Sequence, residues 1–308
     1  MSIRVILNPR AGSGRAAARL PEIRRALTQA GLAFDVRETS SPGHATQLAR
    51  EAHRDGIETI AIVGGDGTTN EVAQAYLDST GAPTAGPQLA LIPAGTGGDF
   101  RKTFGFDDSV DAAISRLKQR QLRRVDLGVV ECEAADGART THAFLNIMSF
   151  GIGGLTDRLV NAGPKWLGGK AAFFLGTIRA LAVYRNAAVE VIVDGKPWLR
   201  GPVLNVAVAN GQFFGGGMHI APNADPSDGL FDIVALGDIS PARSLTLTPK
   251  VYKGTHIGER QVLSCRGARV EARALKSEHE VLIDNDGETP GKLPIRVSLA
   301  QGAVSILS

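Results

Sequence analysis

The sequence predicts two domains: an α/β domain built on a parallel sheet, followed by a domain folded as an antiparallel β-sandwich. Over residues 1–125, short apolar strands alternate with helices, which is typical of a parallel sheet flanked by helices. Over residues 126–308, alternating β segments are joined by glycine turns such as Asp194-Gly195, which favours an antiparallel sandwich. The chain has 308 residues, 43% of them hydrophobic, which is enough to fill two cores.

The first domain is predicted to alternate strands and helices throughout. Strands are expected at residues 3–7, 34–36 and 59–63, and a further apolar strand ends near Pro93. The first helix is marked by Leu20, Ile23 and Leu27 at helical spacing and is ended by Gly31. Three more helices are expected at residues 46–53, 70–77 and 110–117, and the segment 124–128 leads into the second domain.

The second domain is predicted to be mostly β structure. Its strands are expected at residues 143–149, 189–193, 203–209, 231–236, 270–275, 281–283, 295–299 and 303–307. Two helices are expected within it: one at residues 170–185, and one that begins near Ser240, a good N-cap, with Pro241 at the first helical position. The extreme C-terminal strand is also free to pack back onto the first domain.

Composition excludes several classes of protein. The net charge is +3, and the 34 Lys and Arg residues are scattered rather than clustered, which argues against nucleic acid as a partner. Cys132 and Cys265 lack metal-ligand spacing, so a reduced, cytoplasmic setting is expected. No run reaches the roughly 18 apolar residues of a transmembrane helix, which predicts a soluble or peripheral protein. A weak attraction to acidic membrane surfaces remains compatible with the mildly basic charge.

The first of two glycine turns follows the strand at residues 59–63. Gly64, Gly65 and Gly67 allow the backbone to approach a ligand closely, and Thr68 and Thr69 place hydroxyls near the start of the next helix. Asp66 lies in the same turn, where a carboxylate repels phosphate unless a metal ion intervenes or the group accepts a proton from a substrate. The alternative is that Asp66 only caps the helix expected from residue 70.

A second turn of the same kind follows the strand that ends near Pro93. It carries Gly95, Thr96 and Asp99, so two neighbouring strands end in matching turns of glycine, hydroxyl and carboxylate, which indicates one nucleotide site. A third loop, residues 8–15, places Asn8 and Ser13 before a helix. This loop lacks the lysine of a Walker sequence.

These three loops resemble those of the diacylglycerol kinase catalytic family, which includes bacterial soluble lipid kinases and is related to sphingosine kinases. NAD kinases and phosphofructokinases share the turn at residues 64–68, so the family is distinguished by the second turn and by later motifs at residues 205–211, 221–232 and 286–288. The resemblance covers nearly the whole chain and implies a first domain similar to that of NAD kinase and phosphofructokinase. The chain departs from the commoner pattern at Gly98, where many members have asparagine.

The resemblance assigns a nucleotide-binding role to the first domain and a lipid-binding role to the second. It implies that ATP is contacted by Asn8, Ser13, Thr39, Gly64, Gly65, Gly67, Thr68, Thr69, Gly95 and Thr96. It also implies a structural Mg²⁺ held by Asp228, with Asp225 and Leu230 beside it and Asp126 linked through water. Oxygen ligands suit such a hard cation. The alternatives are a polar turn at residues 225–230 and a simple hinge carboxylate at Asp126.

Two residues are candidates for the base that accepts the proton of the lipid hydroxyl. The resemblance assigns this role to Glu288, whereas in related sphingosine kinases the counterpart of Asp66 performs it; both candidates stay open. A plain hairpin turn is the alternative for residues 286–288.

The expected function is transfer of the γ-phosphoryl group of ATP, with Mg²⁺, to a hydroxyl of diacylglycerol or a similar lipid. The expected partner is a lipid at the inner face of the membrane, and the sequence leaves a homodimer open. The alternatives are a soluble-metabolite kinase of the NAD kinase type and a non-catalytic nucleotide or lipid sensor.

Overall fold

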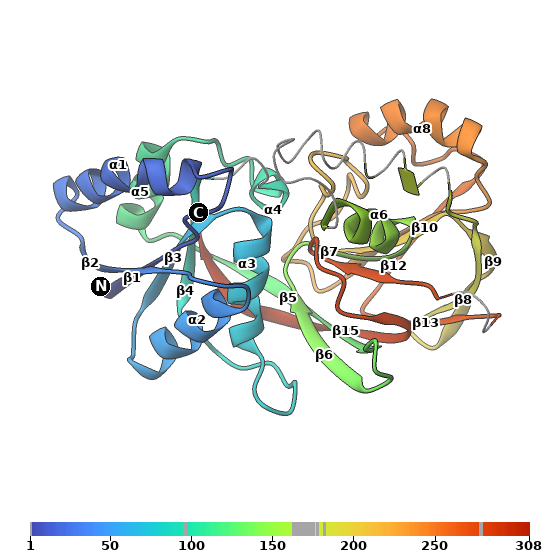
Figure 1. The fold of residues 1–308 in the computed structure, drawn as a ribbon, viewed down its shortest axis with the longest axis horizontal. Coiled ribbons are helices and arrows are strands. Elements are labelled where there is room, and N and C mark those ends of the chain that lie inside the picture. The colour runs from blue at the N-terminus through green and yellow to red at the C-terminus, as the bar shows by residue number, and fades with distance from the viewer. Residues whose placement is uncertain (1, 95–97, 162–175, 177–178, 181–182, 277–279) are drawn as a thin grey trace.

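The computed structural model describes residues 2–94, 98–161, 176, 179–180, 183–276 and 280–308. Two halves of the chain lie side by side, and the long strand β15 crosses from the second half into the first (Figure 1). Within the described residues, no helix has both the length and the apolar character needed to cross a membrane.

The first half is a parallel sheet covered by helices on both faces. Its strands lie in the order β2-β1-β3-β4 and are all paired in parallel. Apolar side chains of α1 and α5 pack on one face, and those of α2 and α3 pack on the other. The elements are β1 (Ser2–Leu7), α1 (Arg15–Gln29), β2 (Ala33–Glu38), α2 (His44–Arg54), β3 (Thr59–Gly64), α3 (Asp66–Ala73), η1 (Gln74–Tyr76), β4 (Gln88–Pro93), α4 (Asp99–Thr103) and α5 (Val110–Gln119).

The second half is an antiparallel sandwich. One sheet has the order β12-β11-β10-β7-β14, and the other continues from β4 through β15, β13, β8 and β9. In this second sheet β5 pairs with β15, and β6 pairs with β5. Val, Ile and Phe side chains from both sheets fill the space between them. The elements are β5 (Leu122–Glu133), β6 (Arg139–Phe144), β7 (Ile147–Gly151), α6 (Ile152–Asn161), β8 (Ala187–Val193), β9 (Lys196–Val203), β10 (Asn205–Ala209), β11 (Phe231–Leu236), α8 (Pro241–Lys253), β12 (Val262–Gly267), β13 (Arg269–Ala274), β14 (Ile283–Asn285) and β15 (Lys292–Leu307).

The two predicted fold types are confirmed, and several element boundaries are wrong. The strand expected at 143–149 is two strands, β6 and β7, because the backbone N–H groups of residues 145–147 donate to Asp286 instead of continuing a ladder. The strands expected at 295–299 and 303–307 are one strand, β15, with an irregular register near Ala300.

The helix expected at 170–185 falls largely outside the described residues. The helix expected after Ser240 is confirmed as α8, and the Ser240 hydroxyl accepts from Arg243 N–H.

Strands β5 and β15 join the two halves. The expected boundary at residue 126 falls inside β5, which pairs with β15 along most of its length. At its end β15 also pairs in parallel with β4, through Ile306 and Leu89. The C-terminus therefore lies in the first half (Figure 1). The division into a nucleotide-binding and a lipid-binding domain stays a prediction.

Candidate functional site

The loops that follow β1, β2, β3 and β4 lie at one edge of the parallel sheet. The registers pair Leu7 with both Glu38 and Val63, and Gly64 with Pro93, so these four strands end at nearly the same level. Ligands of α/β sheets bind outside such carboxyl ends. The structure therefore brings the predicted contacts Asn8, Thr39 and Gly65 to one edge; Gly95 and Thr96 lie outside the described residues.

The turn after β3 is close-packed around Gly64. A Cβ atom at Gly64 would lie 2.4 Å from Thr68 Oγ1, so glycine is required there. The carbonyl of Gly65 accepts from the N–H groups of both Thr68 and Thr69 at 3.1 Å, and Asn8 Nδ2 donates to Thr68 Oγ1 at 3.2 Å. The loop of Asn8 and the turn at Gly64 are therefore held together before any ligand is present.

Two helices begin at this edge without a side-chain cap. Helix α1 starts after Gly14, and α3 starts after Gly65, and neither residue offers a side-chain acceptor to the N–H groups of the first turn. Some of these groups donate to loop carbonyls instead, as Arg15 N–H does to Gly12 and Thr68 N–H does to Gly65. Before α1, Gly12, Ser13 and Gly14 all have positive φ angles. Free N–H groups at a helix N-terminus attract anions, so the arrangement suits phosphate groups.

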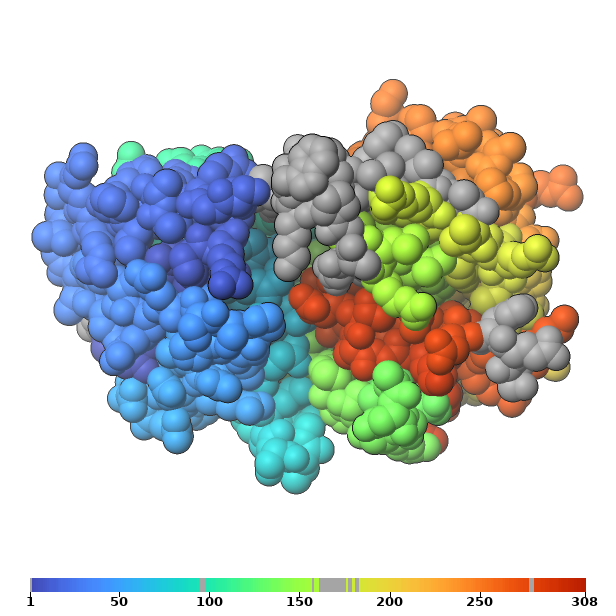
Figure 2. Space-filling view, in the orientation of Figure 1, coloured from blue at the N-terminus to red at the C-terminus, as the bar shows by residue number. Residues whose placement is uncertain are grey.

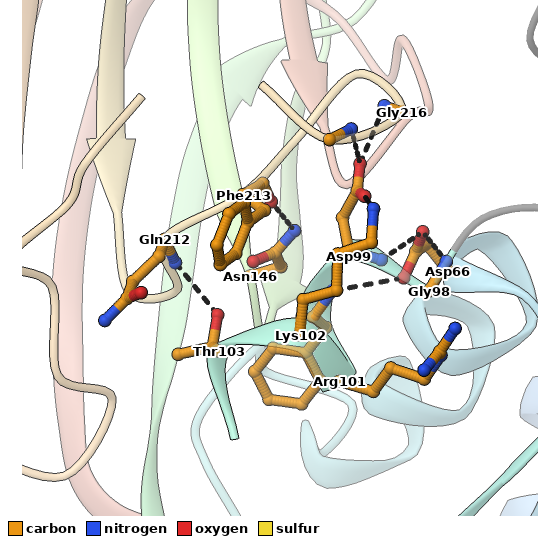
Figure 3. A network of polar contacts seen from close by, with 12 residues as sticks. Asp66, Gly98, Asp99, Arg101, Lys102, Thr103, Asn146, Gln212, Phe213 and Gly216 are labelled. Carbon is orange, nitrogen blue, oxygen red and sulfur yellow. Dashed lines mark hydrogen bonds and ion pairs between the residues drawn. The ribbon is translucent and has the colours of Figure 1, made fainter. Parts of the chain in front are cut away.

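Asp66 caps a helix other than the one the sequence suggested. Its carboxylate accepts from the N–H groups of Gly98 (2.8 Å), Asp99 (3.0 Å) and Phe100 (3.4 Å), at the start of α4 (Figure 3). A cap on a helix starting near residue 70 is wrong, because α3 already begins at Asp66. Burial raises the pKa of Asp66, and the Asp99 carboxylate raises it further, while the three N–H donors oppose the shift.

Asp99 connects the two halves of the molecule, a contact that sequence reasoning missed. Its carboxylate accepts from Gly216 N–H at 2.7 Å and Gly217 N–H at 3.2 Å, and it pairs with Lys102 Nζ at 2.6 Å (Figure 3). Nearby, Gln212 N–H donates to Thr103 Oγ1 at 2.9 Å. The carboxylate after Gly98 was visible in the sequence, but its partners Gly216 and Gly217 lie more than a hundred residues away.

Strand β14 and the turn that follows it carry three acidic residues, Asp284, Asp286 and Glu288. The Asp286 carboxylate accepts from the N–H groups of Leu145, Asn146 and Ile147, and burial raises the pKa of Asp286 to about 7 against these donors. Asp284 accepts from Gly287 N–H at 2.7 Å, which tightens the turn.

Glu288 completes the same turn and differs from Asp286 in its surroundings. No described residue donates a hydrogen bond to its carboxylate in the structure. Partial loss of surrounding water raises the pKa of Glu288, and the carboxylates of Glu71 and Asp284 raise it further. Among the described residues its carboxylate therefore has no hydrogen-bond donor, and its pKa is higher than that of an ordinary glutamate.

A cavity of about 330 Å³ opens between the two halves. Four carboxylates line it, Asp66 and Asp99 from the first half and Asp284 and Asp286 from the second. The rest of its wall is mostly apolar and is formed by Ile147, Ile152, Val160, Leu204, Phe214, Met218, Ile220, Leu236, Leu247 and Val251, together with a few small polar residues. In the sequence these apolar residues are indistinguishable from core residues, so the cavity could not be predicted.

The predicted metal loop wraps around Asp126. The Asp126 carboxylate accepts from Gly229 N–H (2.8 Å) and Gly302 N–H (2.7 Å). Arg123 pairs with Asp225 at 2.6 Å, and Arg266 pairs with Asp228. Burial raises the pKa of Asp126, and the charges of Asp228 and Asp225 add to this.

The predicted ligands Asp126, Asp225 and Asp228 are thus brought together, with Leu230 beside them, but two of them face arginines. Across the described residues, no group of three His, Cys, Asp or Glu side chains stands in metal-binding geometry.

Two family descriptions together match nearly the full length of the chain. The "Diacylglycerol kinase catalytic domain" matches residues 2–130, and the "YegS C-terminal NAD kinase beta sandwich-like domain" matches residues 146–308. The chain belongs to the diacylglycerol kinase catalytic domain family. Membership identifies it as an enzyme of the kinase class and confirms the resemblance seen in the glycine turns.

Individual relatives of this family align with nearly the whole chain. A "Diacylglycerol kinase" of Bacillus subtilis is 28% identical over 294 residues, covering 94% of this chain and 91% of the relative. A "Probable lipid kinase YegS-like" of Xanthomonas euvesicatoria is 30% identical over 287 residues, covering 92% and 89%.

Solved structures support the fold. A diacylglycerol kinase from Bacillus anthracis has a TM-score of 0.71 at 22% identity, covering 99% of this chain and 96% of that one. An NAD kinase from Archaeoglobus fulgidus in complex with ATP has a TM-score of 0.52 at 16% identity, covering 100% and 94%. At these identities the likeness concerns the fold alone, and it confirms the fold class: an α/β half with a parallel sheet followed by an antiparallel β half.

Proposed function

We propose that this protein transfers the γ-phosphoryl group of ATP to a hydroxyl of diacylglycerol or a similar lipid. The observation that carries the proposal is the mostly apolar cavity whose acidic end contains Asp66, from the glycine turn, and Asp286, from the turn of Glu288. An apolar pocket with a few convergent polar groups is typical of a ligand site, and its apolar wall suits an acyl chain. The family names of the relatives support a lipid as acceptor.

The nucleotide is proposed to bind at the carboxyl ends of β1 to β4. Support comes from the uncapped starts of α1 and α3 and from the close backbone packing at Gly64. These features place N–H donors at an edge where phosphates bind favourably. Magnesium bound to the nucleotide would neutralise phosphate charge during transfer. The terminal phosphate would then face the acidic end of the cavity.

Glu288 is proposed as the base that accepts the proton of the lipid hydroxyl. Asp66 and Asp286 are each held by three backbone N–H groups, whereas the Glu288 carboxylate has no such donor among the described residues. A raised pKa suits a base that works near neutral pH. The hydroxyl oxygen forms a bond to the γ-phosphorus, its proton passes to Glu288, and the bond from the γ-phosphorus to the bridging oxygen breaks to leave ADP.

Asp66 is proposed as a positioning residue. By holding the start of α4, it fixes Asp99, and Asp99 in turn holds Gly216 and Gly217 at the cavity. The nucleotide turn and the cavity wall are therefore connected through one chain of hydrogen bonds, which would keep donor and acceptor aligned.

Transfer of labelled γ-phosphate from ATP to candidate acceptors tests this function. With magnesium and mixed micelles of diacylglycerol, we expect the label in a lipid product. Label transferred to NAD, with none in lipid, would instead establish the NAD kinase type of activity. Binding of ATP without any labelled product across a panel of lipids would establish a non-catalytic sensor.

A structural Mg²⁺ at Asp126, Asp225, Asp228 and Leu230 is a further part of the proposal. The donor set fits a hard cation, because it is made of oxygen ligands. Burial raises the pKa of Asp126 and the carboxylates of Asp228 and Asp225 add to this, so a bound cation would favour the charged form. Arg123 and Arg266 compete for the same carboxylates. The metal would stabilise the loop and takes no part in the transfer step.

Thermal unfolding with and without magnesium tests the metal loop. If the ion binds the folded loop, magnesium should raise the melting temperature of the wild type by about 2 °C or more, and Asp228→Asn should lose this increment. Asp136→Asn, in an exposed turn of the same half, is the matched control. Equal melting temperatures for the wild type in magnesium and in chelator would show that the two arginines neutralise the loop instead.

A further inference from the structure

Helix α8 has two apolar faces. Ser244, Leu247 and Val251 lie on the inner face and are buried; all three line the cavity. An ordinary surface helix has one apolar stripe, which faces the core, and polar residues opposite it. Helix α8 departs from this pattern on its outer side.

The outer side carries Ala242, Leu245, Pro249 and Tyr252, which we call the α8 stripe. Their spacing of three, four and three residues places them on one side of a helix. All four are exposed, Leu245 by 66% and Tyr252 by 46%. Across the described part of the chain only five large hydrophobic side chains are exposed, and the stripe holds two of them. Within the part of the chain that the structure describes, this face is therefore left exposed.

Positive charge flanks the α8 stripe. Helix α8 contains Arg243, Lys250 and Lys253 and no acidic residue. Glu259, after the helix, pairs with Arg243 at 2.6 Å and with Lys250. The Lys253 ammonium has no partner among the described residues, and Arg260 adds another positive charge next to Glu259. The surroundings of the stripe are therefore basic overall.

The α8 stripe runs toward the acidic end of the cavity. Helix α8 forms the outer edge of the second half (Figure 1), and its atoms stand out from the surface there (Figure 2). At the other end of the stripe, partial burial raises the pKa of Tyr252, and the Asp99 carboxylate contributes to this shift. Val251, which precedes Tyr252 in the chain, lines the same cavity as Asp99. One helix therefore connects an exposed apolar surface to the cavity.

We propose that the α8 stripe docks on the surface of a bilayer that contains anionic lipids. Apolar side chains flanked by Lys and Arg are the pattern by which a helix lies in the membrane interface, with its apolar side in the acyl boundary and its cations near the headgroups. Docking in this orientation would place the cavity wall that the inner face of the same helix forms about 10 Å, one helix diameter, from the bilayer. The inference rests on the proposed function, because it identifies the membrane as the source of the acceptor lipid.

Sedimentation with vesicles tests the docking surface directly. The wild type should bind vesicles of phosphatidylcholine mixed with phosphatidylglycerol more tightly than vesicles of phosphatidylcholine alone, and added salt should weaken the difference. Leu245→Glu should reduce binding to the mixed vesicles about tenfold or more, because it removes the burial of one leucine and adds a repelled charge. Leu122→Glu, at a leucine 50% exposed on β5, is the matched control and should bind as the wild type does.

Activity measurements separate this inference from the proposed function. Leu245→Glu should transfer phosphate normally to a dispersed short-chain diacylglycerol and poorly to diacylglycerol in vesicles. If vesicle binding depends on Leu245 but the wild type has no lipid kinase activity, the docking surface stands and the proposed function is overturned. Equal vesicle binding by wild type and Leu245→Glu, no binding by the wild type, or a change in oligomeric state in place of vesicle binding would overturn the docking surface.

Discussion

Replacing Glu288 with glutamine is expected to lower kcat for lipid phosphorylation by about 100-fold to 10,000-fold, the range in which general base catalysis contributes. Glutamine keeps the shape of the side chain but cannot accept the hydroxyl proton. Because no described residue donates to the Glu288 carboxylate, the variant should unfold at the wild-type temperature. Initial rates with labelled ATP, together with a thermal melt, measure both effects.

The control for this variant is Glu280→Gln, which removes an exposed carboxylate that pairs with Lys292. It should leave kcat unchanged. The pH profile adds an independent readout: the wild-type rate should fall as the pH drops through the raised pKa of Glu288, because the protonated carboxyl is no longer a base. A rate for Glu288→Gln within about threefold of the wild type would contradict the assignment of the base.

Replacing Asp66 with alanine is expected to impair both activity and stability. The change removes the acceptor of three backbone N–H groups at the start of α4, and buried groups left without partners cost about 1–3 kcal/mol of unfolding free energy. The displaced α4 would also move Asp99 and the glycines that it holds, so kcat should fall about 100-fold or more. Denaturant unfolding and initial rates are the measurements.

Asp107→Ala is the matched control for Asp66→Ala. Asp107 also accepts from a backbone N–H group, that of Ser109, but in an exposed loop where water replaces the lost contact, so little change is expected. Asp66→Asn, which keeps one carbonyl acceptor, should be intermediate in stability. Full activity and stability in Asp66→Ala would refute the role of Asp66 in positioning α4 and Asp99.

Local features of the sequence were sufficient to predict much of the fold. The strand β3 and its glycine turn, and the start of α8 at Ser240, depend on residues that are adjacent in the chain, and the structure confirms both elements. The break between β6 and β7 could not be predicted, because it depends on Asp286, some 140 residues away. The alternative considered for Asp66 was a cap on the helix that follows it, whereas its carboxylate accepts from Gly98 N–H, 32 residues further along, and caps α4.

The site was predictable only where its residues belong to a motif. Glu288 and Asp66 were found from their turns, but the roles assigned to them stay predictions. The apolar wall of the cavity was missed, since Leu204 or Leu247 in a sequence indicates only burial, and an unfilled volume arises from the packing of whole elements. Nor does the sequence place Gly216 beside Asp99, because that contact joins different halves of the chain.

The central claim is that ATP lies at the carboxyl ends of β1 to β4 with its terminal phosphate toward the acidic end of the apolar cavity. A crystal structure with a non-hydrolysable ATP analogue, magnesium and a short-chain diacylglycerol tests it most directly. The account predicts phosphate density at the starts of α1 and α3 and an acyl chain between Leu204 and Leu247, with the lipid hydroxyl near Glu288. Nucleotide density at another surface, with that edge empty, would contradict it.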